Sequence, residues 1–135
     1  MVTSTKHQFL VTVSGVKGYW DEMTGGAGTG TPIRHRNGGS LKEEIIGTPP
    51  TYSDIVVTRG FSPAYRDAYV NLAKNINKTR HTVTKQPTDP DLVPVGKPIT
   101  YPSCLLVGVT FPDSDSNAVG DRSTVQLTFS TNGPA

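Results

Sequence analysis

The sequence predicts a mainly β fold: an antiparallel β-sandwich or barrel with one flanking α-helix and a long loop or hairpin arm. Several segments alternate apolar and polar residues, which is typical of half-buried strands. The 14 glycines and 11 prolines mark many turns, as expected for a chain of short strands. A single segment has apolar residues at helical spacing. With 135 residues, the chain suits one domain covering 1–135.

The chain is predicted to open with two strands. Phe9, Val11 and Val13 alternate with polar residues within 7–14, so one face of this strand is expected in the core. A short second strand is predicted at 19–20, where a tyrosine precedes the single tryptophan.

A long segment at 24–50 follows and is not needed for the domain core. It begins with a glycine-rich tract, continues with charged residues and ends at a pair of prolines. Segments of this length within a compact domain are uncommon and usually functional. We therefore predict an extended loop or β-hairpin arm.

A strand at 52–59 leads into the predicted helix. Ser62 is a suitable N-cap and Pro63 suits the first helical position, where a missing N–H has no cost. The apolar side chains that follow recur at helical spacing and are expected to pack against one face of the sheet. The residues predicted for the core and the helix packing are Tyr65, Tyr69, Leu72, Ile76, Phe9, Val11, Val13, Leu127 and Phe129.

Three more strands are predicted in the C-terminal half, at 80–85, 99–111 and 124–131. The segment between the first two contains four prolines, and a polar turn at 112–121 precedes the last strand. This last strand alternates strictly, with Val125, Leu127 and Phe129 on one side and uncharged polar residues on the other. One face of the strand is therefore expected in the core.

Composition argues against several classes of function. The formal net charge is +2 and the basic residues are scattered, whereas a nucleic-acid-binding domain usually has a basic stripe. The single cysteine, Cys104, excludes an internal disulfide and is interpreted as a buried small apolar residue. There is no signal-peptide pattern at the N-terminus and no apolar stretch of about 18 residues, so we expect folding in a cytoplasm without membrane insertion.

No catalytic, metal or cofactor motif is recognised, and we predict that the chain is not an enzyme and needs no cofactor. The glycine tract lacks the Lys-Ser/Thr and the following helix of a nucleotide-binding loop. Asp113, Asp115 and Asn117 are spaced like the start of a calcium loop, but Ala118 replaces the required glycine. The three histidines do not have metal-ligand spacing.

The order of elements resembles that of the tail tube proteins of bacteriophages and of contractile injection systems, including type VI secretion tubes. The resemblance covers residues 8–131, and two features depart from it: Tyr69 stands where the family's helix often has Trp, and the prolines of 87–98 are unusual. The matching segments are FLVTVSG (9–15), GYWDEMTGG (18–26), IVVTRG (55–60), SPAYRDAY (62–69), SCLLVGVTFPDSD (103–115) and VQLTF (125–129).

This resemblance implies a structural subunit of a phage tail tube. Six copies would form a ring, with neighbouring sheets joined around a channel, and the rings would stack into a hollow tube in the virion tail. The tube would conduct DNA from capsid to host without sequence-specific binding. The implied partners are tape-measure, baseplate and tail-terminator proteins, and a sheath.

Two alternatives remain open at this stage. One is the inner tube of a bacterial contractile injection system. The other is a β-sandwich binding or adhesion module, which needs an exposed aromatic platform. Tyr19 and Trp20 are adjacent and would supply such a platform, or else they anchor the core.

The tail tube interpretation predicts two functional surfaces. Uncharged polar side chains that alternate with core residues are expected to line the channel, where lysines would retain DNA by binding phosphates. The glycine-rich and charged segment is expected to contact the next ring, where charge pairs set register. The predicted lumen residues are Thr124, Gln126, Thr128, Ser130, Thr12 and Ser14. The predicted inter-ring residues are Gly25, Gly26, Gly28, Gly30, Arg34, Arg36, Lys42, Glu43 and Glu44.

Overall fold

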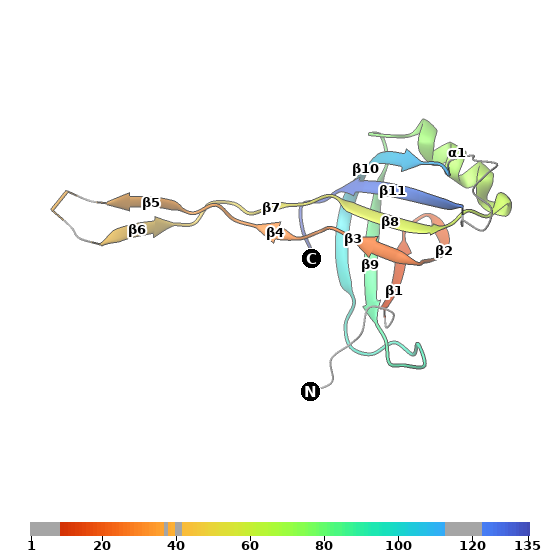
Figure 1. The fold of residues 1–135 in the computed structure, drawn as a ribbon, viewed down its shortest axis with the longest axis horizontal. Helices are drawn as coiled ribbons and strands as arrows, with labels where there is room; N and C mark the ends of the chain where they lie inside the picture. Colours follow the sequence, from red (N-terminus) through yellow and green to blue (C-terminus); the bar gives the residue numbers. More distant parts are fainter. Residues whose placement is uncertain (1–8, 37, 40–41, 113–122) are drawn as a thin grey trace.

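A computed structural model of the protein describes residues 9–36, 38–39, 42–112 and 123–135. The chain forms a body, made of a curled seven-stranded sheet with one helix at its end, and a narrow arm that projects from it (Figure 1). The predicted mainly β fold with one helix and a hairpin arm is confirmed. The predicted turn at 112–121 and the calcium-like positions Asp113, Asp115 and Asn117 lie outside the described residues. Within the described ranges, no helix is both long enough and apolar enough to cross a membrane.

The sheet of the body has the strand order β2-β1-β9-β10-β11-β8-β3, and all neighbouring strands in it are antiparallel. Most predicted strands are present, but they begin or end at other residues than predicted. The short strand predicted at 19–20 is longer than predicted, and a further strand, β3, follows it. The seven strands are β1 (Phe9–Val13), β2 (Val16–Trp20), β3 (Glu22–Thr24), β8 (Ile55–Gly60), β9 (Arg80–Pro87), β10 (Ile99–Thr110) and β11 (Thr124–Ser130).

The two edge strands of this sheet, β2 and β3, are consecutive in the chain and separated only by Asp21. Strand β2 pairs with β1 and strand β3 pairs with β8, so one residue connects the two edges of the sheet and brings them together. The backbone N–H of Asp21 donates to the carbonyl oxygen of Thr58 on β8 over 3.0 Å. The sheet thus curls into a barrel. Strands β1 and β11 lie on opposite sides of this barrel, because β9 and β10 lie between them in the strand order.

Strand β10 forms a corner of the barrel. Its first half pairs with β9 and its second half with β11, and the register shifts between Tyr101 and Cys104. Ser103 lies in this interval with a φ of 54°, a left-handed conformation that is uncommon outside glycine. Bulges of this kind bend a strand and increase its twist, so β10 passes from one layer of the barrel to the other.

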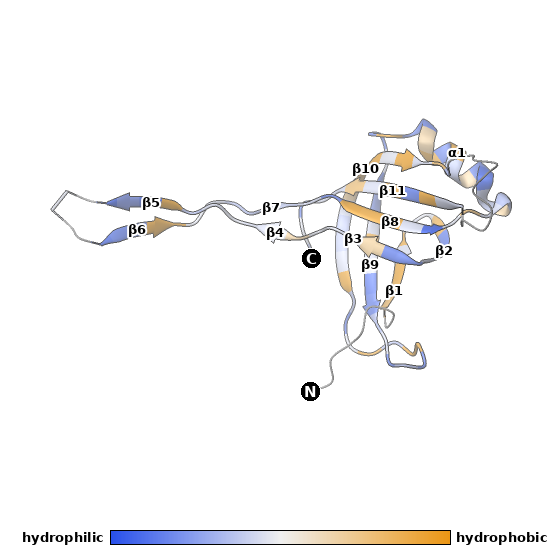
Figure 2. Cartoon of the chain, in the orientation of Figure 1, coloured by the Kyte–Doolittle hydropathy of each residue, from blue (hydrophilic) through white to orange (hydrophobic). Residues whose placement is uncertain are grey.

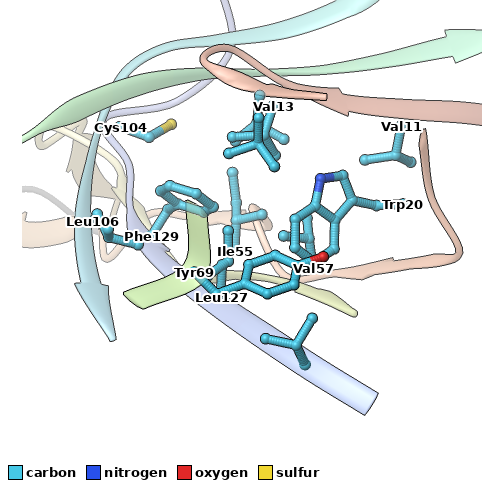
Figure 3. Close-up of a cluster of buried hydrophobic side chains, with 13 residues drawn as sticks. Val11, Val13, Trp20, Ile55, Val57, Tyr69, Cys104, Leu106, Leu127 and Phe129 are labelled. Carbon is cyan, nitrogen blue, oxygen red and sulfur yellow. The ribbon is translucent and has the colours of Figure 1, made fainter. Parts of the chain in front are cut away.

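The core fills the barrel interior, and Figure 3 shows side chains from facing strands meeting there. The alternation seen in the sequence of β11 is reproduced, since Val125, Leu127 and Phe129 are fully buried. Burial of such side chains contributes roughly 1.5–3 kcal/mol each. The buried apolar residues are Val11, Val13, Val16, Trp20, Ile55, Val57, Tyr69, Val83, Cys104, Leu106, Val125, Leu127 and Phe129.

The helical segment differs in detail from its prediction. A 3-10 turn, η1 (Pro63–Tyr65), precedes the helix α1 (Arg66–Lys74), and Ser62 makes no side-chain capping bond. Tyr69 is fully buried and anchors α1 on the barrel, with its ring 5.9 Å from that of Phe61.

Four residues predicted for the core lie elsewhere or are only partly buried, and one of them is Leu72 of α1, which is partly buried and packs against the core. Tyr65 is 40% exposed, so its predicted core position is wrong; it falls in η1, before the helix, where the 3.6-residue period does not apply. Ile76 is partly buried but follows the end of α1. Phe9 is also only partly buried, at the start of β1.

Candidate functional site

The outer face of the layer formed by β10, β11, β8 and β3 is polar and nearly uncharged. Directly opposed residues on antiparallel strands share a face of the sheet. Gln126 is opposed by Thr110 on one side and by Thr58 on the other, and Thr58 is opposed by Glu22. A hydroxyl-rich row therefore crosses four strands, with one carboxylate at its end.

A second row on the same face runs parallel to the first. Thr128 lies between Gly108 and Val56, and Val56 is opposed by Thr24. The four predicted lumen positions of β11 therefore share this outer face: Thr124, Gln126, Thr128 and Ser130.

The other two predicted lumen residues are not on that face. Thr12 is opposed by Thr84 of β9, which is opposed in turn by Thr100 of β10. This row lies on the outer side of the β1–β9 layer, across the core from β11. Ser14 follows β1, and its hydroxyl oxygen accepts a hydrogen bond from the backbone N–H of Thr82 over 2.9 Å. The fold therefore separates Thr12 and Ser14 from the β11 face.

The arm consists of two short two-stranded sheets in succession. At its base, β4 (Gly28–Thr29) pairs with β7 (Thr51–Tyr52). Farther out, β5 (Ile33–Arg36) pairs with β6 (Glu43–Ile46), and all eight of these residues are exposed. Isolated two-stranded hairpins are marginally stable in water, so an arm of this length is suited to being covered by a partner.

The charged residues of the arm lie on both of its faces. Arg36 opposes Glu43, and both Arg34 and Arg36 approach the Glu43 carboxylate, at 3.5 and 3.9 Å. These pairs are long and exposed, so each contributes little to stability. Glu44 opposes His35 on the other face, while Lys42 precedes β6.

The arm also exposes three isoleucines, which the sequence analysis did not single out. Ile33 opposes Ile46 on one face, and Ile45 lies on the other. Their exposed fractions are 53%, 43% and 60%. Figure 2 shows hydrophobic residues on the half of β5 and β6 nearer the body and hydrophilic residues toward the tip. In the sequence, the apolar Ile45-Ile46 pair inside a polar segment could have indicated this exposed apolar surface.

The glycine tract fixes the base of the arm. The rings of two tyrosines pack directly on glycine backbone: Tyr101 on Gly26, and Tyr52 between Gly28 and Gly133. A Cβ added at Gly26 would meet the Tyr101 ring at 3.0 Å, and one added at Gly28 would meet the Tyr52 ring at 2.7 Å.

Gly25 and Gly30, the other two glycines of the tract, differ in the space around them. Gly25 has a φ of 90° and a Cβ there would overlap the carbonyl oxygen of Asp54, whereas Gly30 has open space around it. A tract with this many glycines has a large entropic cost of ordering. In the fold, body residues and the C-terminal segment supply the contacts that order it.

Acidic and basic side chains border one groove on the body. In the part of the chain that is described, no group of three or more metal-ligating side chains lies together. A groove of about 220 Å³ opens between β1 and β3, lined by acidic and apolar residues and by Lys85. The Lys85 ammonium lies 4.5 Å from the centroid of the Phe9 ring.

The whole body and arm match known structures. No protein-family model and no curated protein matches the sequence. Twenty-one solved chains match the structure. A chain of the sheath–tube complex of an extracellular contractile injection system, PVC, in its extended state has a TM-score of 0.80, is 14% identical, and covers 97% of this chain and 88% of its own.

Two cap structures agree with this match. A chain of the tube-terminating cap of the anti-feeding prophage has a TM-score of 0.84 at 14% identity, covering 100% of this chain and 91% of its own. A chain of the PVC sheath/tube terminator has a TM-score of 0.82 at 14% identity, covering 100% and 96%. This is the fold of contractile injection system tube and cap proteins.

The similarity to the solved chains includes the arm. The matches cover the arm as well as the body, because they extend over nearly all of the chain. The arm is thus part of the tube-protein fold in these solved chains.

Proposed function

We propose that this chain is a tube-forming structural subunit, without catalytic activity, whose six-membered rings stack into a hollow tube. The observation that carries the proposal is the match of nearly the whole chain to sheath–tube, baseplate and terminator structures, at TM-scores from 0.74 to 0.84. The exposed arm and the uncharged outer face of β11 support it, because both suit a molecule that is covered by further copies.

The solved matches favour the injection-system form of this proposal. Their names describe a sheath–tube complex, a baseplate and terminators, so a sheath, a baseplate and a terminator are proposed partners. In a phage tail, the same tube would conduct DNA in the virion, and a tape-measure protein would be a further partner. The adhesion alternative needs a platform of Tyr19 and Trp20, but Trp20 is 3% exposed and its ring lies in the core.

The channel wall is proposed to be the outer face of β11. Its polar side chains carry no charge, so a passing polymer would meet hydrogen-bonding groups without phosphate-binding lysines. Thr12 and Ser14 lie on the opposite layer of the barrel, so this proposal does not include them in the wall.

Chemical labelling of assembled tubes tests the channel wall. Gln126→Cys should react with N-ethylmaleimide in tubes, but a large polyethylene glycol maleimide should label it only in the dissociated subunit. Cys104 is buried and gives a low background. Thr84→Cys, on the opposite layer, is the matched control. Equal labelling of Gln126→Cys by the large reagent in tubes and in free subunits would contradict the assignment.

Electron microscopy of an arm deletion tests the assembly. Residues 32–47 are replaced by Asn-Gly, which keeps the β4–β7 base and the hydrogen bond from the Thr48 hydroxyl to the carbonyl of Thr31. The wild-type protein should form six-fold rings and tubes at high concentration, and the deletion should form folded subunits or rings that do not stack. A wild-type protein that stays monomeric up to millimolar concentration would contradict the proposed function.

A further inference from the structure

Strand β8 connects two exposed regions at opposite ends of the body. At its start, Val56 pairs with Thr24 of β3, and the arm leaves the body next to this pair. At its end, Gly60 pairs with Thr124 of β11. In Figure 1 the arm extends from one end of the body, while β2 and α1 lie at the other.

The end opposite the arm exposes aromatic side chains. Tyr19 of β2, Tyr65 of η1 and Phe111, which follows β10, are 60%, 40% and 40% exposed. Hydrogen bonding and register bring them to one end. The Arg59 guanidinium donates to the carbonyl oxygen of Lys17 on β2 and lies 5.1 Å from the centroid of the Tyr65 ring.

Phe111 belongs to the same end by register. Thr110 pairs with Gln126 of β11, which pairs with Thr58 of β8, two residues before the end of that strand. We call Tyr19, Tyr65 and Phe111 the aromatic end.

We propose that the aromatic end of one copy receives the β5–β6 segment of a second copy in the next ring. The proposal rests on the proposed stacking of rings. Successive rings in a tube are related by a shift along one axis and a rotation about it. The end of a subunit that faces the next ring therefore meets the opposite end of the subunits in that ring. An arm that extends along the tube then reaches the aromatic end.

The chemistry of the two surfaces is complementary. The arm presents Ile33, Ile45 and Ile46, and aliphatic side chains bury apolar area well against aromatic rings. It also presents Arg34, whose side chain is 62% exposed and whose guanidinium can stack on an exposed tyrosine such as Tyr19. Tyrosine, phenylalanine and arginine are enriched in protein interfaces, so both surfaces have an interface composition.

One other exposed apolar surface competes for the arm. The loop between β9 and β10 exposes Leu92, Val93 and Val95 by 49%, 55% and 53%. The Asp89 carboxylate fixes this loop by accepting hydrogen bonds from the backbone N–H groups of Asp91 and Val93. The loop joins β9 to β10 and is not placed at either end of β8, so it does not oppose the arm along the body.

Two double variants separate these surfaces. Tyr19→Ser with Phe111→Ser removes apolar area from the aromatic end, and Leu92→Ser with Val95→Ser removes a comparable area from the loop. The first variant should raise the protein concentration at which tubes form by about tenfold or more, while the second should leave it within about threefold of wild type. Circular dichroism and urea unfolding establish that each variant is folded.

The outcomes distinguish this inference from the proposed function. Wild-type tubes together with normal tubes from the aromatic-end variant, or loss of tubes in the loop variant alone, would overturn the inference and leave the tube function standing. Wild-type protein without rings or tubes would overturn both.

Crosslinking provides a second measurement that does not depend on the folding of the serine variants. Ile45→Cys and Phe111→Cys are made in two separate proteins with different tags, and the proteins are mixed before assembly. A short bismaleimide should link the two tags in tubes and not in dissociated subunits. Mixed tubes that give no such product, but link Ile45→Cys to Val95→Cys instead, would assign the arm to the loop.

Discussion

The guanidinium group of Arg59 lies 4.3 Å from the centroid of the Trp20 ring, inside the barrel. Its Nε donates to the Tyr69 hydroxyl and its Nη1 to the carbonyl oxygen of Lys17, both over 2.6 Å. One side chain thus joins β8 to the helix and to β2, where the barrel closes. Figure 3 shows the Trp20 and Tyr69 rings among the buried side chains of the core.

Arg59 is a buried cation surrounded by aromatic rings. Arg59 is 7% exposed, and within the described chain its Nη2 has no hydrogen-bond partner. The aromatic rings of Trp20, Tyr65 and Tyr69 lie within 4.3–5.3 Å of its guanidinium carbon and stabilise the charge through their π faces.

Replacement of Arg59 should destabilise the monomer. Arg59→Ala leaves the buried Tyr69 hydroxyl without this partner and opens a cavity at the closure of the barrel, so we expect a loss of about 3 kcal/mol or more in the free energy of unfolding. Lys17→Ala is the control, because Arg59 bonds the backbone of Lys17 and this substitution should have an effect below about 0.5 kcal/mol. Urea unfolding measures both. A variant Arg59→Ala within about 1 kcal/mol of wild type would contradict the role of Arg59.

The glycines of the arm base should differ in their tolerance of alanine. Gly25→Ala requires a left-handed backbone and overlaps the carbonyl of Asp54, so we expect a loss of about 3 kcal/mol or more. Gly30→Ala meets no neighbouring atom and should be neutral or slightly stabilising. Thermal unfolding compares the two variants. Equal unfolding temperatures would show that the base of the arm is not held as described.

The two faces of β11 should respond differently to truncation. Leu127 is fully buried, and Leu127→Ala should cost about 2–5 kcal/mol through lost burial and the cavity that it leaves. Gln126→Ala, one residue away on the outer face, should change stability by less than about 0.5 kcal/mol. Urea unfolding of the free subunit provides the comparison, and a large effect of Gln126→Ala would mean that its side chain is buried in the subunit.

The ion pairs of the arm should matter for assembly and not for folding. Arg34→Ala removes a 3.5 Å contact with Glu43 between exposed side chains, so the free energy of unfolding should change by less than about 0.5 kcal/mol. Tube formation should require a higher protein concentration, because the proposed contact with Tyr19 is lost. Sedimentation across a concentration series measures this. Unchanged assembly would remove Arg34 from the proposed contact.

Much of the fold was determined by local patterns in the sequence. The alternation of Val125, Leu127 and Phe129 with polar residues fixed which face of β11 is buried, because side chains on a strand point to opposite faces in turn. The long polar segment between two apolar strands likewise predicted an arm, since it has too few apolar residues to add to the core.

Tertiary structure alone decided which of these local faces come together. The sequence shows polar alternation in both β1 and β11, but only the strand order places Thr12 and Gln126 on opposite sides of the barrel. The partners of Arg59 come from positions as far as 42 residues away, and the Tyr52 ring packs on Gly133 near the end of the chain. Such contacts depend on how distant strands pair and bend. The pattern of apolar and polar residues in a single strand predicts which side chains are buried. It does not predict which distant residues they contact.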